Sequence, residues 1–473
     1  MHKRCFLPRS STLAALASAA LLGGCMNLIP AYQRPAAPLP TEYAPELAAV
    51  DAAGSAAADI DWQQYFADAR LRRLIEIALT NNRDLRVAAL NIEQARAAYQ
   101  IRKADELPTL GVGATAQRQA GAAGSLTHSY AFGAQMTAYE LDFFGRVRSL
   151  SQAALAQYLA TEDARQTVQI ALVASVANTY VNLLADAELL RVTGDTLKTR
   201  EASFKLVALK FDNGAASDLD RSQAEQLLEG ARATLAQTTR QRALDENALV
   251  LLLGQALPAD LPPASILDTQ QTLVDLPAGL PSDLLARRPD VRAAEQQLIA
   301  ANANIGAARA AFFPRISLTA NAGTASSALD KLFASGTFAL TGGATLLQPL
   351  FDAGRSQANL DVAKINREIA VAQYEKAIQT AFREVSDALA GRATLGEQLR
   401  AQTAQARAAQ TSFKLAELRY RHGASSYLDV LDAQRALFAS EQARVQVQAL
   451  QVQNLLTLYK VLGGGWKSTP VTN

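Results

Sequence analysis

One stretch of the chain occurs twice, and this repeat decides the fold. Residues 203–220 read Ser203-Phe-Lys-Leu-Val-Ala-Leu-Lys-Phe-Asp-Asn-Gly-Ala-Ala-Ser-Asp-Leu-Asp220, and residues 412–429 read Ser412-Phe-Lys-Leu-Ala-Glu-Leu-Arg-Tyr-Arg-His-Gly-Ala-Ser-Ser-Tyr-Leu-Asp429. The second copy begins 209 residues after the first. The sequence therefore predicts a tandem duplication with halves at 61–281 and 282–465. Further pairs are Arg146 with Arg355 and Gly254 with Gly463 at the same offset, and Asp84 with Asp290 and Pro108 with Pro314 at an offset of 206.

Each half is expected to contain a helix, two strands, a long helix, a tight turn and a second long helix. Apolar residues recur at helical spacing, and no proline interrupts residues 109–257 or 350–469. Helices near 144–210 and 353–420 would have about 65 residues and reach on the order of 100 Å at about 1.5 Å per residue. The predicted strand hairpins lie at 107–143 and 313–351, and the predicted helical hairpins at 144–254 and 353–462.

The segments between the helices alternate with a period of two. Leu110 and Val112 alternate with Gly111 and Gly113, and the second half repeats the pattern from Ile316. Such segments fit membrane-spanning barrel strands, and an ordinary half-buried sheet has the same alternation. Four strands are too few to close a barrel, and an open sheet would leave its edge amides without partners in lipid. If these strands span a membrane, several chains must share one barrel.

The N-terminus has the order of a secretory signal peptide, predicted at residues 1–24. Basic residues precede an apolar run at 13–22, which is too short to span a bilayer as a helix. Leu22-Gly23-Gly24-Cys25 resembles a bacterial lipobox, which implies lipidation of Cys25; cleavage elsewhere, with Cys25 incidental, is the alternative. Met26, in place of aspartate, implies sorting to the outer membrane. Residues 25–60 are rich in Pro and Ala and are expected to form a tether, and 466–473 a C-terminal tail.

The composition argues against several functional classes. The chain has two cysteines, and Cys5 would leave with the signal peptide while Cys25 would be acylated, so disulfides and thiol chemistry are not expected. A formal net charge of +2 offers no argument for nucleic acid as a partner. The sequence contains three histidines and no Gly-rich phosphate loop, so we predict no metal, no cofactor and no enzyme. A structural envelope lipoprotein is the other rival, but such a spacer has no use for amphipathic strand hairpins.

Two stretches carry a family resemblance. Leu276-Pro-Ala-Gly-Leu-Pro-Ser-Asp-Leu-Leu-Ala-Arg-Arg-Pro-Asp-Val-Arg-Ala-Ala-Glu295 and Ala300-Ala-Asn-Ala-Asn-Ile-Gly-Ala-Ala-Arg-Ala-Ala-Phe-Phe-Pro314 resemble the signature of the TolC-like outer membrane efflux proteins, in the lipoprotein branch that serves tripartite RND-type drug efflux. Trp62, the Leu74-Ile75 pair and the duplication agree with this family.

The resemblance implies an α+β membrane protein that assembles as a homotrimer. Three sets of four strands would form one 12-stranded outer-membrane β-barrel, continuous with a long periplasmic α-helical barrel. The implied function is a passive exit duct for small molecules such as drugs, with a periplasmic adaptor protein and an inner-membrane efflux pump as partners. Type I protein secretion and metal-ion efflux are the alternatives within the family.

The two turns between long helices are the candidate adaptor-docking sites. Gly214 and Gly423 follow a helix end, and Ser217 and Ser426 precede the next helix, as expected for C-capping and N-capping residues. In the family these turns form the periplasmic tips that narrow the closed tunnel and meet the adaptor.

Asp429 and Asp432 match the family's paired aspartates, which line the constriction. A spacing of three residues places both carboxylates on one helical face. The alternative for Asp429 is a capping box with Ser426.

Tyr420, Asp220 and Arg421 are the candidate interhelical lock that keeps the tip closed. Tyr420 and Asp220 match positions that bond between helices in relatives, and plain packing is the alternative for Tyr420. Ser425 stands where relatives have arginine, and Arg421 is expected to take over that role.

Overall fold

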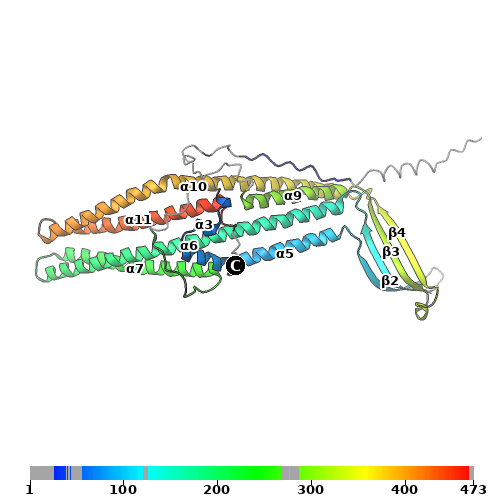
Figure 1. Ribbon diagram of the computed structural model, residues 1–473, viewed down its shortest axis with the longest axis horizontal. Coiled ribbons are helices and arrows are strands. Elements are labelled where there is room, and N and C mark those ends of the chain that lie inside the picture. The colour runs from blue at the N-terminus through cyan, green and yellow to red at the C-terminus, as the bar shows by residue number, and fades with distance from the viewer. Residues whose placement is uncertain are drawn as a thin grey trace, which may run out of the picture. The chain divides into compact units, whose positions relative to one another are not determined.

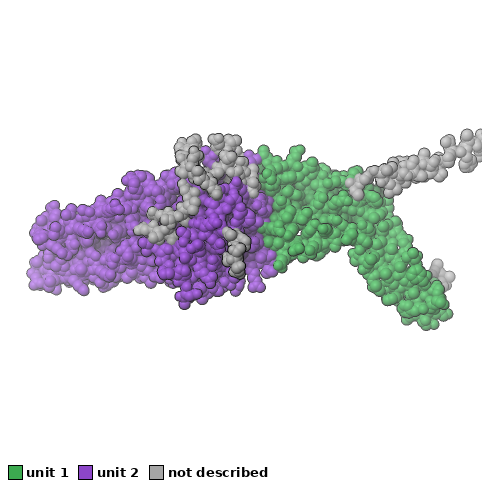
Figure 2. Space-filling model, viewed as in Figure 1, with its two compact units in different colours: residues 1–36, 91–162, 293–375 green, residues 37–90, 163–292, 376–473 purple. Residues whose placement is uncertain are grey.

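The computed structural model describes residues 26–38, 40, 43, 56–120, 126–267, 276 and 287–467. The predicted signal peptide and Cys25 lie outside these residues. The chain divides into two compact units (Figure 2). Unit 1 comprises residues 1–36, 91–162 and 293–375, and unit 2 comprises residues 37–90, 163–292 and 376–473.

Unit 1 contains one antiparallel four-stranded sheet (Figure 1). Its strands are β1 (Leu110–Ala120), β2 (Leu126–Glu140), β3 (Arg315–Ser326) and β4 (Phe338–Leu347), and they neighbour one another in sequence order. The two predicted hairpins therefore join through β2 and β3, one strand from each half of the duplication. β1 and β4 remain the edge strands of the sheet.

The register of the sheet separates apolar from polar side chains. One row across the four strands consists of Val112, Ala134, Ala322 and Leu340. The neighbouring row, on the opposite face, consists of Gly111, Gln135, Asn321 and Thr341. This alternation is the pattern of a barrel strand with one face to lipid and one to the lumen.

The helices follow the same order in both halves, which confirms the predicted duplication. Each half has a helix of 22 residues before its strands and a helix of 67 residues after them, and then a turn and a helix of 36 or 35 residues. The first half contains α5 (Arg83–Ala104), α6 (Arg146–Asp212) and α7 (Asp218–Leu253), and the second contains α9 (Pro289–Ala310), α10 (Arg355–Arg421) and α11 (Tyr427–Val461). Shorter elements are η1 (Ala57–Asp59), α3 (Trp62–Tyr65), α4 (Ala69–Asn81) and η3 (Leu329–Lys331).

The core of unit 2 ties the first short helix to the last long one. The rings of Tyr65 in α3 and Tyr459 in α11 stack with centroids 3.9 Å apart. Their hydroxyls donate to the carbonyls of Leu455 and Ile60, at 2.9 and 2.8 Å. Trp62 is buried beside them, with 2% of its surface exposed. These contacts explain why α3 forms although it has only four residues.

One buried carboxyl group lies between α6 and α7. Asp186 is 6% exposed and faces Asp245. Burial, and then the neighbouring carboxylate, raise the pKa of Asp186 to about 7. Near neutral pH Asp186 is therefore only partly ionised.

The two halves differ where the strands meet the long helices. Glu140, at the end of β2, accepts two hydrogen bonds from the Arg146 guanidinium at 2.7 Å and one from Arg315 at 2.6 Å. The residue 209 positions after Glu140 is Pro349, so Arg355 lacks the carboxylate that its counterpart Arg146 has. The duplication has conserved the backbone plan but not this ion-pair network.

Candidate functional site

The two helical turns have the same backbone structure. Gly214 and Gly423 both have φ of 71°, a conformation that favours glycine. The amide after each glycine donates to a carbonyl five residues earlier: Ala215 to Lys210 at 2.7 Å, and Ala424 to Arg419 at 2.8 Å. These bonds satisfy carbonyls at the helix end, as in a Schellman motif.

Both following helices begin with a complete capping box. In α7 the Ser217 hydroxyl accepts from the Asp220 amide and the Asp220 carboxylate accepts from the Ser217 amide, both at 3.1 Å. In α11 the corresponding distances between Ser426 and Asp429 are 3.4 and 3.2 Å. Asp429 therefore does cap its helix, and a role in the constriction would be additional.

Asp432 has no part in capping. Its carboxylate is 63% exposed and pairs with Arg435 on the same helix at 3.1 Å. Asp429 is also exposed, one turn away on the same face. The residue 209 positions before Asp432 is Gln223, so the first turn has the capping acid but not the second acid. If Asp432 has a role other than helix capping, it need not be repeated at the first turn, and this is what the sequence has.

The candidate lock residues do not form a single cluster. Tyr420 and Asp220 both lie near Tyr427, and, after burial, their charges help to raise the pKa of Tyr427 to about 12. The Tyr420 and Tyr427 rings lie 5.2 Å apart. Arg421 instead pairs with Glu417 on its own helix at 2.7 Å. The lock itself stays a prediction.

Two residues of this region were not singled out from the sequence. Lys210 of α6 places its ammonium 4.1 Å from the centre of the Tyr420 ring, which joins the two helical hairpins by a cation–π contact. Tyr427 lies in a buried cluster at the turns and is 6% exposed. The other buried members of this cluster are Val207, Ala224, Leu227, Val430 and Leu431. Both Lys210 and Tyr427 fall inside the repeated stretch, and this position in the sequence could have marked them as candidates.

Polar contacts continue along α11 and fasten it to α6. The Gln434 amide donates to Ser203 at 3.0 Å, and Arg444 donates to Glu188 at 3.1 Å. Further from the turns, Gln453 donates to Asn182 at 2.5 Å. These side chains would have to separate if the two helices moved apart.

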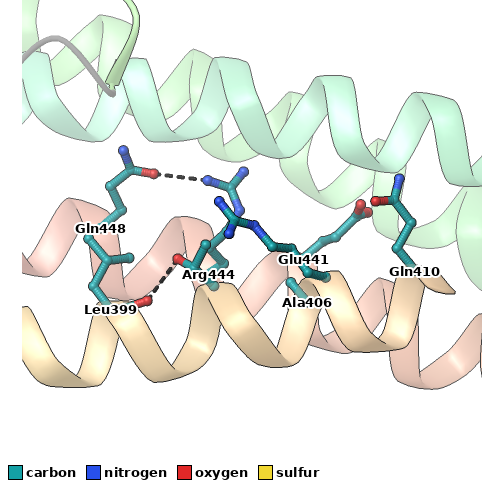
Figure 3. Close-up of a pocket in the computed structure, with 8 residues that line it drawn as sticks. Leu399, Ala406, Gln410, Glu441, Arg444 and Gln448 are labelled. Atoms are coloured by element: carbon teal, nitrogen blue, oxygen red, sulfur yellow. Dashed lines mark hydrogen bonds between the residues drawn. The ribbon is translucent and has the colours of Figure 1, made fainter. Parts of the chain in front are cut away.

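A polar cavity of about 440 Å³ lies between α10 and α11. Figure 3 shows Arg444 and Gln448, one turn apart on α11, joined by a hydrogen bond of 3.2 Å, with Gln410 at the other end of the cavity. Burial raises the pKa of Glu441, against the effect of nearby arginines. Within the part of the chain that the structure describes, no group of three or more His, Cys, Asp or Glu side chains is placed to hold a metal ion.

Comparisons with known proteins agree with this architecture. A family model described as "Outer membrane efflux protein" matches residues 74–255 and 280–464. The "Toluene efflux pump outer membrane protein TtgC" of Pseudomonas putida is 49% identical over 466 residues, 96% of each chain. Outer membrane protein OprJ of Pseudomonas aeruginosa is 44% identical over 461 residues, again 96% of each chain. The open-state crystal structure of the MtrE outer membrane channel of Neisseria gonorrhoeae is 41% identical, with a TM-score of 0.85, and the match covers 93% of this chain and 99% of that one.

These findings confirm the resemblance drawn from the sequence and the fold that it implied. The protein has an α+β membrane fold in which a trimer builds a 12-stranded β-barrel from four strands per chain, with a periplasmic α-helical barrel. It resides in the outer membrane and has a periplasmic portion. The chain belongs to the outer membrane efflux protein family: it is the outer-membrane channel component of a tripartite efflux system and not an enzyme.

Proposed function

We propose that the channel is a passive exit duct for small apolar and amphiphilic molecules, opened at its helical turns by a periplasmic adaptor and driven by an inner-membrane pump. One observation carries the proposal: a single chain supplies four strands with one apolar face and leaves β1 and β4 as edges. Such a sheet becomes stable in lipid only when other copies complete the ring. The names of relatives, which include toluene, solvent and antibiotic efflux pumps, support this cargo class.

The gate in this proposal is the pair of helical turns. Asp429 and Asp432 from three chains would form an acidic ring, and the repulsion between these charges would favour widening. Closure would then depend on contacts around Tyr420, Asp220 and Arg421, together with the buried cluster at the turns. Adaptor binding at Gly214, Ser217, Gly423 and Ser426 would offset those contacts and let the helices separate.

Attachment to the membrane is proposed to involve lipid as well as the barrel. Cys25 would become the acylated first residue of the mature chain, because it closes the lipobox-like tetrad after the apolar run. The acyl chains would enter the leaflet that faces the periplasm.

The experiment combines pore formation with a test in cells. Detergent-purified protein should migrate as a trimer and form pores in planar bilayers, whereas the heat-dissociated sample should form none. In a strain that lacks its own efflux channel but retains adaptor and pump, the gene should restore tolerance to toluene. A monodisperse monomer without pore activity would refute the proposal.

A further inference from the structure

Part of the segment predicted to be a tether lies against unit 1. Residues 26–34 run along α9, with both termini of the contact fixed by hydrogen bonds. The Met26 amide donates to the Phe143 carbonyl at 3.0 Å, just after the end of β2. At the other end Arg34 donates two hydrogen bonds to the Glu295 carboxylate, at 2.7 and 2.8 Å. We call residues 26–34 the N-terminal strap.

One face of α9 forms the seat of the strap. Arg309 donates to the Leu28 carbonyl at 3.2 Å, and Asn302, which is 4% exposed, donates to the Pro30 carbonyl at 2.8 Å. These residues and Glu295 follow one another at intervals of seven, which is two helical turns, so they share a face. The seat therefore meets the strap with polar side chains at three levels.

Close packing completes the seat between two of these levels. A Cβ at Gly306 would lie 2.5 Å from the Cγ1 atom of Ile29 and 2.7 Å from the hydroxyl of Ser149 on α6. The strap thus fills the groove between α9 and α6, helices that belong to different halves of the duplication. Any side chain at position 306 would have to displace it.

Glu295 is the centre of the clasp at the distal end of the strap. Its side chain is 9% exposed and accepts from the Tyr32 hydroxyl at 3.0 Å as well as from Arg34. Burial, and then the charge of Glu295, raise the pKa of Tyr32 far above its usual value, so that Tyr32 stays a donor. A buried carboxylate of this kind is costly without its partners, which ties the fold of this site to the presence of the strap.

The duplication supplies an internal comparison. At the offset of 206, the counterparts of Glu295, Asn302 and Gly306 in α5 are Ala89, Arg96 and Gln100. The first half therefore lacks the carboxylate, the amide and the glycine, although its helix has the same length. The seat is a specialisation of α9 and not a feature of the shared helical plan.

We propose that the N-terminal strap is a positioning segment, seated on α9 and clasped by Glu295, that fixes the acylated N-terminus at the junction between β2 and α6. The lipid would then not be on a free tether, because Met26, which donates to the Phe143 carbonyl, would directly follow the acylated residue in the mature chain. Its acyl chains would enter the membrane directly beside the strands of the same chain. This inference rests on the proposed lipidation of Cys25.

The first test is protease release of the lipopeptide from the folded channel. Chymotrypsin cleaves after Tyr32, which is 36% exposed but has to release its hydrogen bond to Glu295 before its ring can enter the protease. Glu295→Gln removes the charge that holds Arg34 and should release the N-terminal peptide at least about tenfold faster, because hydrogen bonds to charged groups are among the strongest. Glu384→Gln is the matched control, since that carboxylate accepts from Arg288 at 2.8 Å and does not touch the strap.

The second test measures the position of the strap directly. Spin labels on Asn27→Cys and Gln100→Cys, both exposed positions in unit 1, should give one narrow distance distribution in the wild-type background and a broad one with Glu295→Gln. Equal release rates for Glu295→Gln and Glu384→Gln, or a broad distribution before the clasp is altered, would overturn the proposal. Mass spectrometry of the released peptide separates the two ideas: an unmodified Cys25 refutes the lipid anchor, whereas a protected strap stands independently of it.

Discussion

Replacing Asp429 and Asp432 together with Asn would separate helix capping from charge at the turns. An amide oxygen at position 429 can still accept from the Ser426 amide, so the cap should persist. The ion pair of Asp432 with Arg435 is exposed, at 63% and 44%, and contributes about 0.5 kcal/mol at most. The double variant should therefore fold with nearly unchanged stability.

The effect of the double substitution on ion permeation is larger than its effect on stability, because it occurs in all three chains of the trimer. The double substitution removes two charges per chain and hence six per channel. A carboxylate about 10 Å from a permeating ion contributes about 0.4 kcal/mol in bulk water, so six contribute about 2 kcal/mol before salt screening. We expect the permeability ratio of potassium over chloride to fall by several-fold at 0.1 M KCl, and the difference to shrink at 1 M.

Reversal potentials across planar bilayers under a KCl gradient would measure this ratio. Asp218→Asn is the matched control, because Asp218 is an exposed acid at the first turn that pairs with Arg221 on its own helix at 2.9 Å and has no part in the proposed gate. Ser426→Ala gives the converse change: it removes the cap, at a cost of about 1 kcal/mol, and keeps the charge. The assignment of the acidic ring would be refuted if the double variant kept the wild-type reversal potential.

Three further predictions concern stability and the closed state. Asp186→Asn should weaken a pH dependence: burial, and then Asp245, raise the pKa of Asp186 in the folded state, so the folded state loses stability as the pH rises from about 4 to about 7. The melting temperature, followed by circular dichroism between pH 5 and 8, should fall more steeply with pH in the wild type than in the variant. Gly391→Ala would place a Cβ 2.2 Å from the Asn454 amide oxygen and should cost about 1–3 kcal/mol, measured as a lower melting temperature. Tyr427→Ala should cost about 3 kcal/mol of packing at the turns and raise the resting conductance, and an unchanged conductance would place the closing contacts elsewhere.

The helical and strand plan followed from the internal repeat, the periodicity of apolar residues and the absence of proline from the long helices. The helices α6 and α10 each lie within two residues of the ranges expected at both ends. The capping boxes were also visible, because Ser and Asp three residues apart after a glycine turn have one common use. Helix caps are formed by residues that are close neighbours in the sequence, so they can be predicted from the sequence.

Contacts between distant segments were not predictable in the same way. The N-terminal strap has no periodicity, and its proline-rich composition is equally typical of a free linker. The contact of Lys210 with Tyr420 depends on the relative register of two hairpins, which no single-helix pattern determines. The pairing of Asp186 with Asp245 likewise requires knowing which faces of α6 and α7 meet.

The unequal halves of the duplication have a consequence for how such a ring can evolve. In the alignment of the two halves, Glu140 corresponds to Pro349, Asp432 to Gln223, and Glu295 to Ala89. In a closed ring of six identical single-repeat subunits, every mutation would occur six times. In a ring of three duplicated subunits, a mutation in one repeat changes only three of the six repeats, and the other three keep their sequence. Tandem duplication thereby allows the alternating repeats of one ring to take different roles. One set of three repeats can provide anchoring and charge, while the other set only supports the fold.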